Sequence, residues 1–245
     1  MQTVTRKQVT LLRTRIKYIL HDYSRSYRYL APLTLFLIVV LVSYSSKPNF
    51  LMDSYAFTAL LMYFVSAWLC ISLFAAEPEI QKQLTILHMG NVKTYYLAKV
   101  LSTGIISLAL ACFAVIFPLV SGMFHEPVTW KIVLFVLLNH LLFGLLGISL
   151  AAFFTKEFIK SPINGFGGLL FILIASVPFE SLYAMLPSPV NQLLWVLPPV
   201  SHTISALDAW DRQSISINLL LPFLAAAAYV AAMQIIFLTL VKKRR

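Results

Sequence analysis

The sequence has little charge of either sign and very few acidic residues. Only 11% of its 245 residues are charged and nine are Asp or Glu, whereas 60% are hydrophobic. A soluble domain typically carries about 25% charged residues, so this composition excludes a water-soluble globular domain and a disordered chain. The alternating ten-residue strands of an outer-membrane barrel are missing from the sequence as well. The remaining class is an all-α membrane protein, because a helix satisfies its own backbone polar groups in lipid.

Cysteine is equally scarce. Cys70 and Cys112 are the two cysteines, and both lie in long apolar runs. A disulfide framework needs paired, oxidised cysteines, so we interpret both as small apolar packing residues. The first 28 residues lack the short apolar core and the small-residue cleavage site of a secretory signal peptide. We therefore expect them to belong to the folded protein.

Long uncharged runs predict six membrane spans, since crossing the hydrocarbon takes about 20 helical residues. The predicted spans cover residues 29–46, 54–76, 100–124, 132–155, 161–179 and 213–241. A seventh uncharged run, residues 181–207, contains four prolines. Proline lacks a backbone donor and interrupts a helix. We therefore predict an extracellular, re-entrant, proline-broken helical hairpin over residues 180–212 instead of a seventh span.

The basic residues indicate the orientation. A net charge of +10 superficially suggests nucleic acid, but the cytoplasmic loops of membrane proteins collect Lys and Arg without it. With a cytoplasmic N-terminus and six spans, 16 of the 19 basic residues fall inside, and Lys47, Lys131 and Arg212 fall outside. A seventh span would weaken this bias to 12 against 7. We expect a multi-pass protein of the cell membrane with both termini cytoplasmic, with the lipid bilayer and no nucleic acid among its partners.

Residues 1–28 predict a basic amphipathic helix, since seven of them are Lys or Arg. The apolar stripe at helical spacing consists of Val9, Leu12, Ile16, Ile19 and Tyr23. A basic helix with such a stripe typically lies along the cytoplasmic membrane surface. A simple topology anchor would explain the charges but not the stripe, so we favour the interfacial helix.

The segment between the second and third spans, residues 77–90, predicts a short, well-capped cytoplasmic helix. Pro78 suits the first helical position, and Glu77 and Glu79 suit the positive end of the helix dipole. Gly90 suits a left-handed cap at the end of the helix. One face of this helix is apolar and contains Ile80, Leu84 and Leu87.

A plain connector needs only a few residues, so we infer that a partner docks on this helix. The docking residues that we expect are its acidic and polar side chains and its proline, namely Glu77, Pro78, Glu79, Gln81, Lys82, Gln83, Thr85 and His88. The alternative is a helix that merely rests on lipid headgroups, because amphipathicity alone does not separate the two.

Together these features resemble the ABC-2 type permeases, the membrane halves of ATP-binding cassette exporters. Shared with that family are six spans, a basic amphipathic N-terminal helix, a capped cytoplasmic helix after the second span and a proline-broken hairpin before the last. Glu79, followed by Tyr96 and Lys99, looks like the family pattern, as does Leu-Pro-Pro-Val-Ser at 197–201. The frequent Gly-Thr pair of the family is replaced by Gln-Leu-Thr at 83–85.

The resemblance implies a transport subunit without its own ATPase site or catalytic residues. In the family, the helix after span 2 couples to a cytoplasmic ATPase subunit, which holds ATP and Mg, and a second permease copy or a paralogue completes the pathway. In keeping with this, the sequence has no G-x-x-x-x-G-K-[ST] phosphate loop. The small size resembles permeases that export or clear peptides such as bacteriocins. Spans with almost no charge favour an amphipathic or hydrophobic substrate over ion-coupled transport.

Candidates for the substrate pathway are polar and aromatic residues within the predicted spans, namely Thr58, Tyr63, Ser66, Asn139, His140 and Asn164. A hydrogen bond to a neighbouring helix is the commoner role of such residues, and we favour it. Asn139-His140 superficially resembles a motif of intramembrane proteases that process prenylated proteins. Those enzymes also need paired glutamates and a second His, and His88 and His202 are predicted on opposite sides of the membrane. A non-transport membrane protein, either an assembly scaffold or such a protease, is the alternative. The sequence has no Cys/His metal set.

Overall fold

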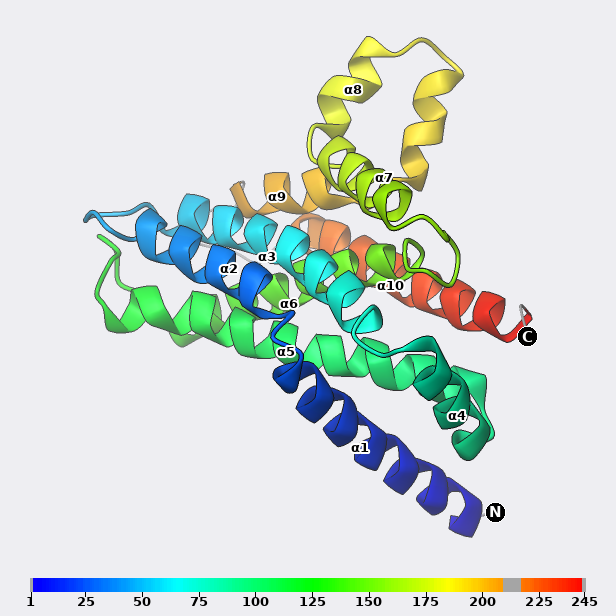
Figure 1. The fold of residues 1–245 in the computed structure, drawn as a ribbon. Helices are drawn as coiled ribbons and strands as arrows, with labels where there is room; N and C mark the ends of the chain where they lie inside the picture. The colour runs from blue at the N-terminus through cyan, green and yellow to red at the C-terminus, as the bar shows by residue number, and fades with distance from the viewer. Residues whose placement is uncertain (1, 209–216, 244–245) are drawn as a thin grey trace.

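The computed structural model describes residues 2–208 and 217–243, which form helices and loops without a named strand in these ranges (Figure 1). In chain order the helices are α1 (Gln2–Arg25), α2 (Leu30–Ser43), α3 (Leu51–Phe74), α4 (Glu79–Met89), α5 (Val92–Val120), α6 (Trp130–Ala152), α7 (Pro162–Ala175), α8 (Phe179–Met185), the 3-10 helix η1 (Val190–Val196), α9 (Val200–Asp208) and α10 (Ile217–Lys243). The predicted all-α architecture is confirmed.

Helix α3 is the centre of a bundle in which α2, α5, α6 and α10 lie roughly alongside it (Figure 1). It packs on α2, α5, α6 and α9, and α10 packs on α5, α6 and α9. The loops α2–α3 and α5–α6 lie together at one end of the bundle. Helix α4 and the described C-terminus lie at the other end, which we call the α4 end.

Four helices, α3, α5, α6 and α10, are long and apolar enough to cross a membrane, so the chain has the features of a multi-pass membrane protein. The number rises to six if each of two bent pairs, α1 with α2 and α7 with α8, forms one span. The bends measure 80° and 84°. Helices α2 and α7 have 14 residues each, about 21 Å of helix, whereas the hydrocarbon is about 30 Å thick.

The predicted span boundaries differ most where the helices bend. The predicted span 29–46 contains one short helix, α2, and the 80° bend lies before it, between α1 and α2. The predicted span 161–179 contains α7 and the 84° bend after it, and α7 ends before Pro178, since a residue that precedes proline is driven out of the helical conformation. Helix α5 begins at Val92 and not at residue 100. Residues 209–216, which include the end of the predicted hairpin and the beginning of the predicted last span, lie outside the described residues.

Helix α6 carries two glycines, one where it meets α3 and one where it meets both α5 and α3. A Cβ added at Gly147 would lie 2.1 Å from the backbone oxygen of Tyr63, and one at Gly144 would lie 2.2 Å from the Oγ of Ser107. Small residues at helix contacts let backbones pack closely in membranes, where dispersion and hydrogen bonds drive association. The glycines therefore fix the core that carries the α4 end.

We expect Gly147→Ala to lower the free energy of unfolding by about 1–3 kcal/mol, because the new methyl group would overlap the α3 backbone. The matched control is Gly104→Ala in α5, where an added Cβ meets nothing within 4 Å. Alanine is the better helix former by about 1 kcal/mol, so the control should leave stability unchanged or raise it. Thermal unfolding in detergent measures both, and equal midpoints for the two variants would contradict the close contact.

The apolar stripe of α1 packs against the helical bundle, whereas the sequence predicted that it would face the membrane surface. Ile19 and Tyr23 are buried against the bundle, and Leu12 and Ile16 pack on the same cluster. These four residues of the stripe therefore contact protein, chiefly α5, while the side chain of Val9 lies outside the described residues. The stripe can reach the bundle because the chain bends sharply between α1 and α2. Tyr27 lies at this bend and adopts a left-handed φ of 56°. Arg13 and Lys17, one turn apart, are exposed and make an outward face of α1 basic.

Short helices fill the proline-containing region, but they do not extend from the end of the bundle. Helices α8 and η1 pack on each other and project sideways, while α9 returns to α3 and α10 (Figure 1). The predicted extracellular hairpin over residues 180–212 thus divides into a projecting part and a part, α9, that belongs to the bundle. Several large apolar side chains of the projecting part are exposed, among them Met185, Leu193, Trp195 and Val196.

Candidate functional site

Helix α4 has well-defined ends, although it begins one residue later than predicted. Pro78 has an extended ψ of 150° and precedes the helix as its cap, and Glu79 is the first helical residue. Gly90 adopts a left-handed φ of 62°, and its N–H bonds to the carbonyl oxygen of Ile86 at 3.0 Å. The side chain of Asn91 then accepts a hydrogen bond from the N–H of Lys93 at 2.9 Å and caps α5. Only Gly90 and Asn91 join the two helices, which sets the angle between them.

The outward face of α4 is the apolar one, contrary to our expectation that the polar side chains would be exposed. Ile80 is 77% exposed, Leu84 62% and Leu87 78%. Among the polar residues, Lys82 is buried and Gln81 and Thr85 are half-buried. The reversal has a physical reason, because the inward-facing polar groups find charged and hydroxyl partners on α1, α5 and the α6–α7 loop.

Three polar side chains of α4 do remain exposed beside these apolar residues. They are Glu79, Gln83 and His88. We call the exposed set of six, Glu79, Ile80, Gln83, Leu84, Leu87 and His88, the α4 surface. An apolar centre with a polar rim is the usual composition of a protein–protein contact.

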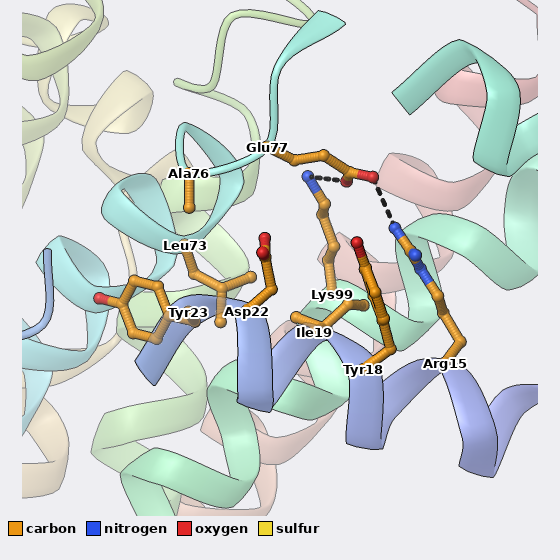
Figure 2. Close-up of a pocket in the computed structure, with 9 residues that line it drawn as sticks. All are labelled: Arg15, Tyr18, Ile19, Asp22, Tyr23, Leu73, Ala76, Glu77 and Lys99. Atoms are coloured by element: carbon orange, nitrogen blue, oxygen red, sulfur yellow. Dashed lines mark hydrogen bonds and ion pairs between the residues drawn. The ribbon is translucent and has the colours of Figure 1, made fainter. Parts of the chain in front are cut away.

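Glu77, which we expected on the docking surface, is buried at the end of α3 with 5% of its side chain exposed. Its carboxylate lies 2.7 Å from the guanidinium of Arg15 and 3.2 Å from the Nζ of Lys99 (Figure 2). It also accepts hydrogen bonds from the hydroxyl of Tyr95 at 2.5 Å and of Thr85 at 3.2 Å. These five residues form the Glu77 cluster, which joins α1, α4 and α5 to the loop that follows α3.

The Glu77 cluster is tightly packed. Arg15 also lies over the ring of Tyr95, 5.4 Å from its centroid, and Lys99 lies 5.1 Å from the centroid of the same ring. The cavity beside the cluster measures only about 10 Å³, and Asp22 and Tyr18 point into it from α1 (Figure 2). Lys99, with 3% of its side chain exposed, has no access to bulk water and depends on Glu77 for its charge compensation.

The pKa of Glu77 is lowered from its ordinary value of 4.5. Burial raises this pKa, but the nearby Lys99, the hydroxyl of Tyr95 and Arg15 together outweigh burial. A carboxyl group whose pKa is lower in the folded protein stabilises the fold fully above its unfolded pKa. This stabilisation disappears as the pH falls through the lowered pKa, so Glu77 is ionised and stabilising at neutral pH.

A second ion cluster ties α4 to the loop between α6 and α7. The Nζ of Lys82 pairs with Glu157 in that loop and with Glu79 at 3.1 Å. The side chain of Lys82 is 9% exposed, so this cation is held inside and is not available to a docking partner. Helix α4 is consequently fastened through Thr85 and Glu77 to α1 and α5, and through Lys82 to the segment that leads into α7.

An open groove separates α4 from α1. It has a volume of about 390 Å³, and its walls are Leu11, Thr14, Arg15, Tyr18, Gln81, Leu84, Thr85, His88 and Met89. Gln81 crosses the groove to the hydroxyl of Tyr18. Since Leu84 and His88 belong to both the groove and the α4 surface, the two features form one continuous region.

Three of the candidate pathway residues form hydrogen bonds between helices. Thr58 bonds to the Nε2 of His140 at 2.9 Å, and Ser66 bonds to Ser107 at 2.9 Å. The Nδ1 of His140 faces the carbonyl oxygen of Val136 at 2.8 Å, so Nδ1 carries the proton and Nε2 accepts from Thr58. These contacts are those of helix packing.

Tyr63, Asn139 and Asn164 lie in three different surroundings. The hydroxyl of Tyr63 lies 3.1 Å from that of Ser176 beyond the end of α7. Asn139 is buried, and its amide has no hydrogen-bond partner within the described part of the chain. Asn164 is exposed at the start of α7. None of the six candidates lines the groove or the small cavity described above, so the structure does not bring them together into one site.

The parts that the protease hypothesis needs are far apart. Thr58, the partner of His140, is separated from the end of α3 at Phe74 by 16 helical residues, about 24 Å. Glu77 and Glu79 lie beyond that end and are held in the two ion clusters. Among the described residues there is no group of three His, Cys, Asp or Glu that could hold a metal ion.

The sequence did not predict the ion pairs that three residues form in the two clusters, namely Arg15, Lys99 and Glu157. Arg15 lies on the buried face of α1 beside Ile16 and Ile19, and such a cation within an apolar stripe signals an internal partner. Lys99 was associated by family pattern with Glu79, but its partner is Glu77. Glu157 follows α6 in a short loop and carries no pattern that indicates its pairing with Lys82.

Comparison of the chain with protein-family models, with curated proteins and with solved structures finds no match in any of the three. The function is therefore inferred from the α4 surface, the Glu77 cluster and the composition of the spans.

Proposed function

We propose that this chain is the permease subunit of an ABC exporter, driven by ATP hydrolysis on a separate cytoplasmic ATPase subunit. A second permease copy or a paralogue would complete the translocation pathway. The proposal rests on the resemblance to ABC-2 permeases and on one structural observation above all. That observation is the α4 surface, a capped helix that presents apolar side chains to the outside at the α4 end of the bundle.

The composition of the α4 surface favours a protein partner over a lipid surface. Ile80, Leu84 and Leu87 lie at helical spacing and would gain free energy by burial, at about 25 cal/mol per Å². Glu79 beside them is unsuited to an anionic membrane surface, which attracts Lys and Arg. A folded partner with a complementary groove would cover both kinds of side chain. The groove between α1 and α4 extends the area available to it.

The two ion clusters support a role for α4 in transmitting movement. A push on α4 would act through Thr85 and Glu77 on α1 and α5, and through Lys82 on the loop before α7. Since these contacts are charged and largely buried, α4 cannot shift without carrying its neighbours along or breaking a costly pair. ATP binding and hydrolysis on a docked partner would in this way change the packing of the spans.

The small number of free polar side chains in the spans indicates the class of substrate. Thr58, Ser66 and His140 are engaged in helix packing, so the described spans offer few free polar groups to a charged solute. An amphipathic or hydrophobic substrate fits such a lining, and a peptide is the class that we propose. The exposed apolar side chains of the projecting α8 and η1 suit contact with a second copy of the chain.

The proposal requires the α4 end to face the cytoplasm, and cysteine labelling tests this. In a chain without Cys70 and Cys112, we expect Gln83→Cys on α4 to react with an impermeant maleimide only after the cells are opened. Ser46→Cys, in the exposed loop at the other end of the bundle, is the matched position and should react in intact cells. Reaction of Gln83→Cys from outside would place α4 where no ATPase works and would overturn the proposal.

A further inference from the structure

An apolar slot lies at the bend between α1 and α2. It has a volume of about 190 Å³ and is lined by Leu20, Tyr23, Ser24, Tyr29, Leu33, Leu69, Ile106 and Leu110. Four elements contribute to it, since these residues belong to α1, α2, α3 and α5 with the short turn before α2. Its inner wall is buried at Leu69 and Leu110, and Ser24 at its mouth is exposed.

Two arginines are direct neighbours in the chain of residues that line the slot. Arg25 follows Ser24 in the last turn of α1, and Arg28 precedes Tyr29 in the turn. Arg28 is close enough to Tyr23, which lines the slot, for its charge to act on the phenol. Both arginines are exposed, and neither forms an ion pair with an acid in the described part of the chain.

We propose that this slot binds one anionic phospholipid, with an acyl chain between α2 and α5 and the phosphate at Arg25 and Arg28. Basic pockets between membrane helices are suited to anionic headgroups, and long basic side chains reach from the helix ends to the interface. The site is independent of the ATPase contact, because the slot shares no residue with the α4 surface.

The geometry favours a lipid over a protein segment. The walls present a single apolar surface without a hydrogen-bonding group other than the hydroxyls of Tyr23, Ser24 and Tyr29. Of these, Tyr23 is already bonded to Ser72, and Ser24 donates to the carbonyl oxygen of His21. A polypeptide backbone inserted here would lose its hydrogen bonds to water, whereas an acyl chain has none to lose.

Native mass spectrometry of the full chain in detergent tests this site. The protein is incubated with an equal mixture of dioleoyl phosphatidylglycerol and dioleoyl phosphatidylcholine, and bound lipids are counted. We expect one phosphatidylglycerol to be retained selectively. The double variant Arg25→Gln/Arg28→Gln should reduce this selectivity roughly thirtyfold, since each basic residue contributes about fivefold at an anionic surface. Both side chains are exposed, so folding should persist.

Three comparisons separate this site from weaker explanations. The variant Arg13→Gln/Lys17→Gln removes the same charge from the exposed face of α1, away from the slot. It should leave the selectivity for phosphatidylglycerol within about twofold of wild type, because general attraction of the anionic lipid to basic residues on α1 does not produce that selectivity. Leu33→Trp fills the slot and should reduce retention of both lipids. Glycerol 3-phosphate, which has the anion without chains, should not displace the lipid. Equal losses in the two double variants, displacement by glycerol 3-phosphate, or unchanged retention in Leu33→Trp would overturn the proposal.

Discussion

Replacing Glu77 with glutamine is expected to lower the free energy of unfolding by about 3–5 kcal/mol, the usual cost of removing one partner from a buried ion pair. The variant would leave Lys99, with only 3% of its side chain exposed, and Arg15 without their common anion. Helix α1 should also become easier to cleave around Arg15, because this polar contact is lost, while its apolar stripe and the bond between Tyr23 and Ser72 keep it on the bundle. Thermal unfolding in detergent and protease cleavage within residues 10–25 measure the two effects.

Two further variants distinguish the buried pair from a general effect of charge. Glu79→Gln removes an acid that is 63% exposed, and Glu157 continues to hold Lys82, so we expect a change within about 1 kcal/mol. Glu77→Gln combined with Lys99→Met removes the unpaired cation as well and should recover much of the lost stability. Equal stabilities of the Glu77 and Glu79 variants would show that the Glu77 cluster does not hold the α4 end together.

The fold class follows from composition, and the interiors of the four long helices follow from the uncharged runs. The bends do not follow from the uncharged runs, however. The predicted span 29–46 holds the 14-residue α2, which an 80° bend separates from α1, and the predicted span 161–179 ends in the 84° bend between α7 and α8. Tyr27 at the first bend has a left-handed φ, and a bulky residue in that conformation is not indicated by any sequence pattern.

The candidate site was located by sequence, but its orientation was wrong. Periodicity divides α4 into an apolar and a polar face without saying which one turns inward. In water the apolar face would turn inward, but here Glu77, Lys82 and Thr85 find charged or hydroxyl partners inside the protein. The contacts join residues up to 75 positions apart, and such pairings depend on the packing of the helices.

The second large effect is expected on the α4 surface. Leu84→Asp places a charge at the centre of the apolar patch and should weaken binding of an ATPase subunit by roughly thirtyfold or more, the effect of losing an interface hot spot of about 2 kcal/mol. Glu79→Arg should act in the same direction, because a mismatched charge in an interface can cost several kcal/mol. Both residues are exposed, so insertion and folding should be unaffected.

Two measurements detect weaker binding of the ATPase subunit. They are the retention of the ATPase during purification and the rate of substrate-stimulated ATP hydrolysis in vesicles. Lys131→Glu, an exposed substitution at the opposite end of the bundle, is the matched control and should leave both at the wild-type level. Wild-type retention and rate in Leu84→Asp and Glu79→Arg together would reduce α4 to a connector on the membrane surface.

The most direct test of the central claim is a photocrosslink from position 84 in living cells, with the captured peptides identified by mass spectrometry. A photoreactive residue at Leu84 should capture a protein that contains a G-x-x-x-x-G-K-[ST] phosphate loop, the part that this chain lacks. The same residue at Lys131 should not capture that protein. Capture of lipid alone at position 84, or the same partners at both positions, would contradict the assignment of this chain as a permease driven through α4.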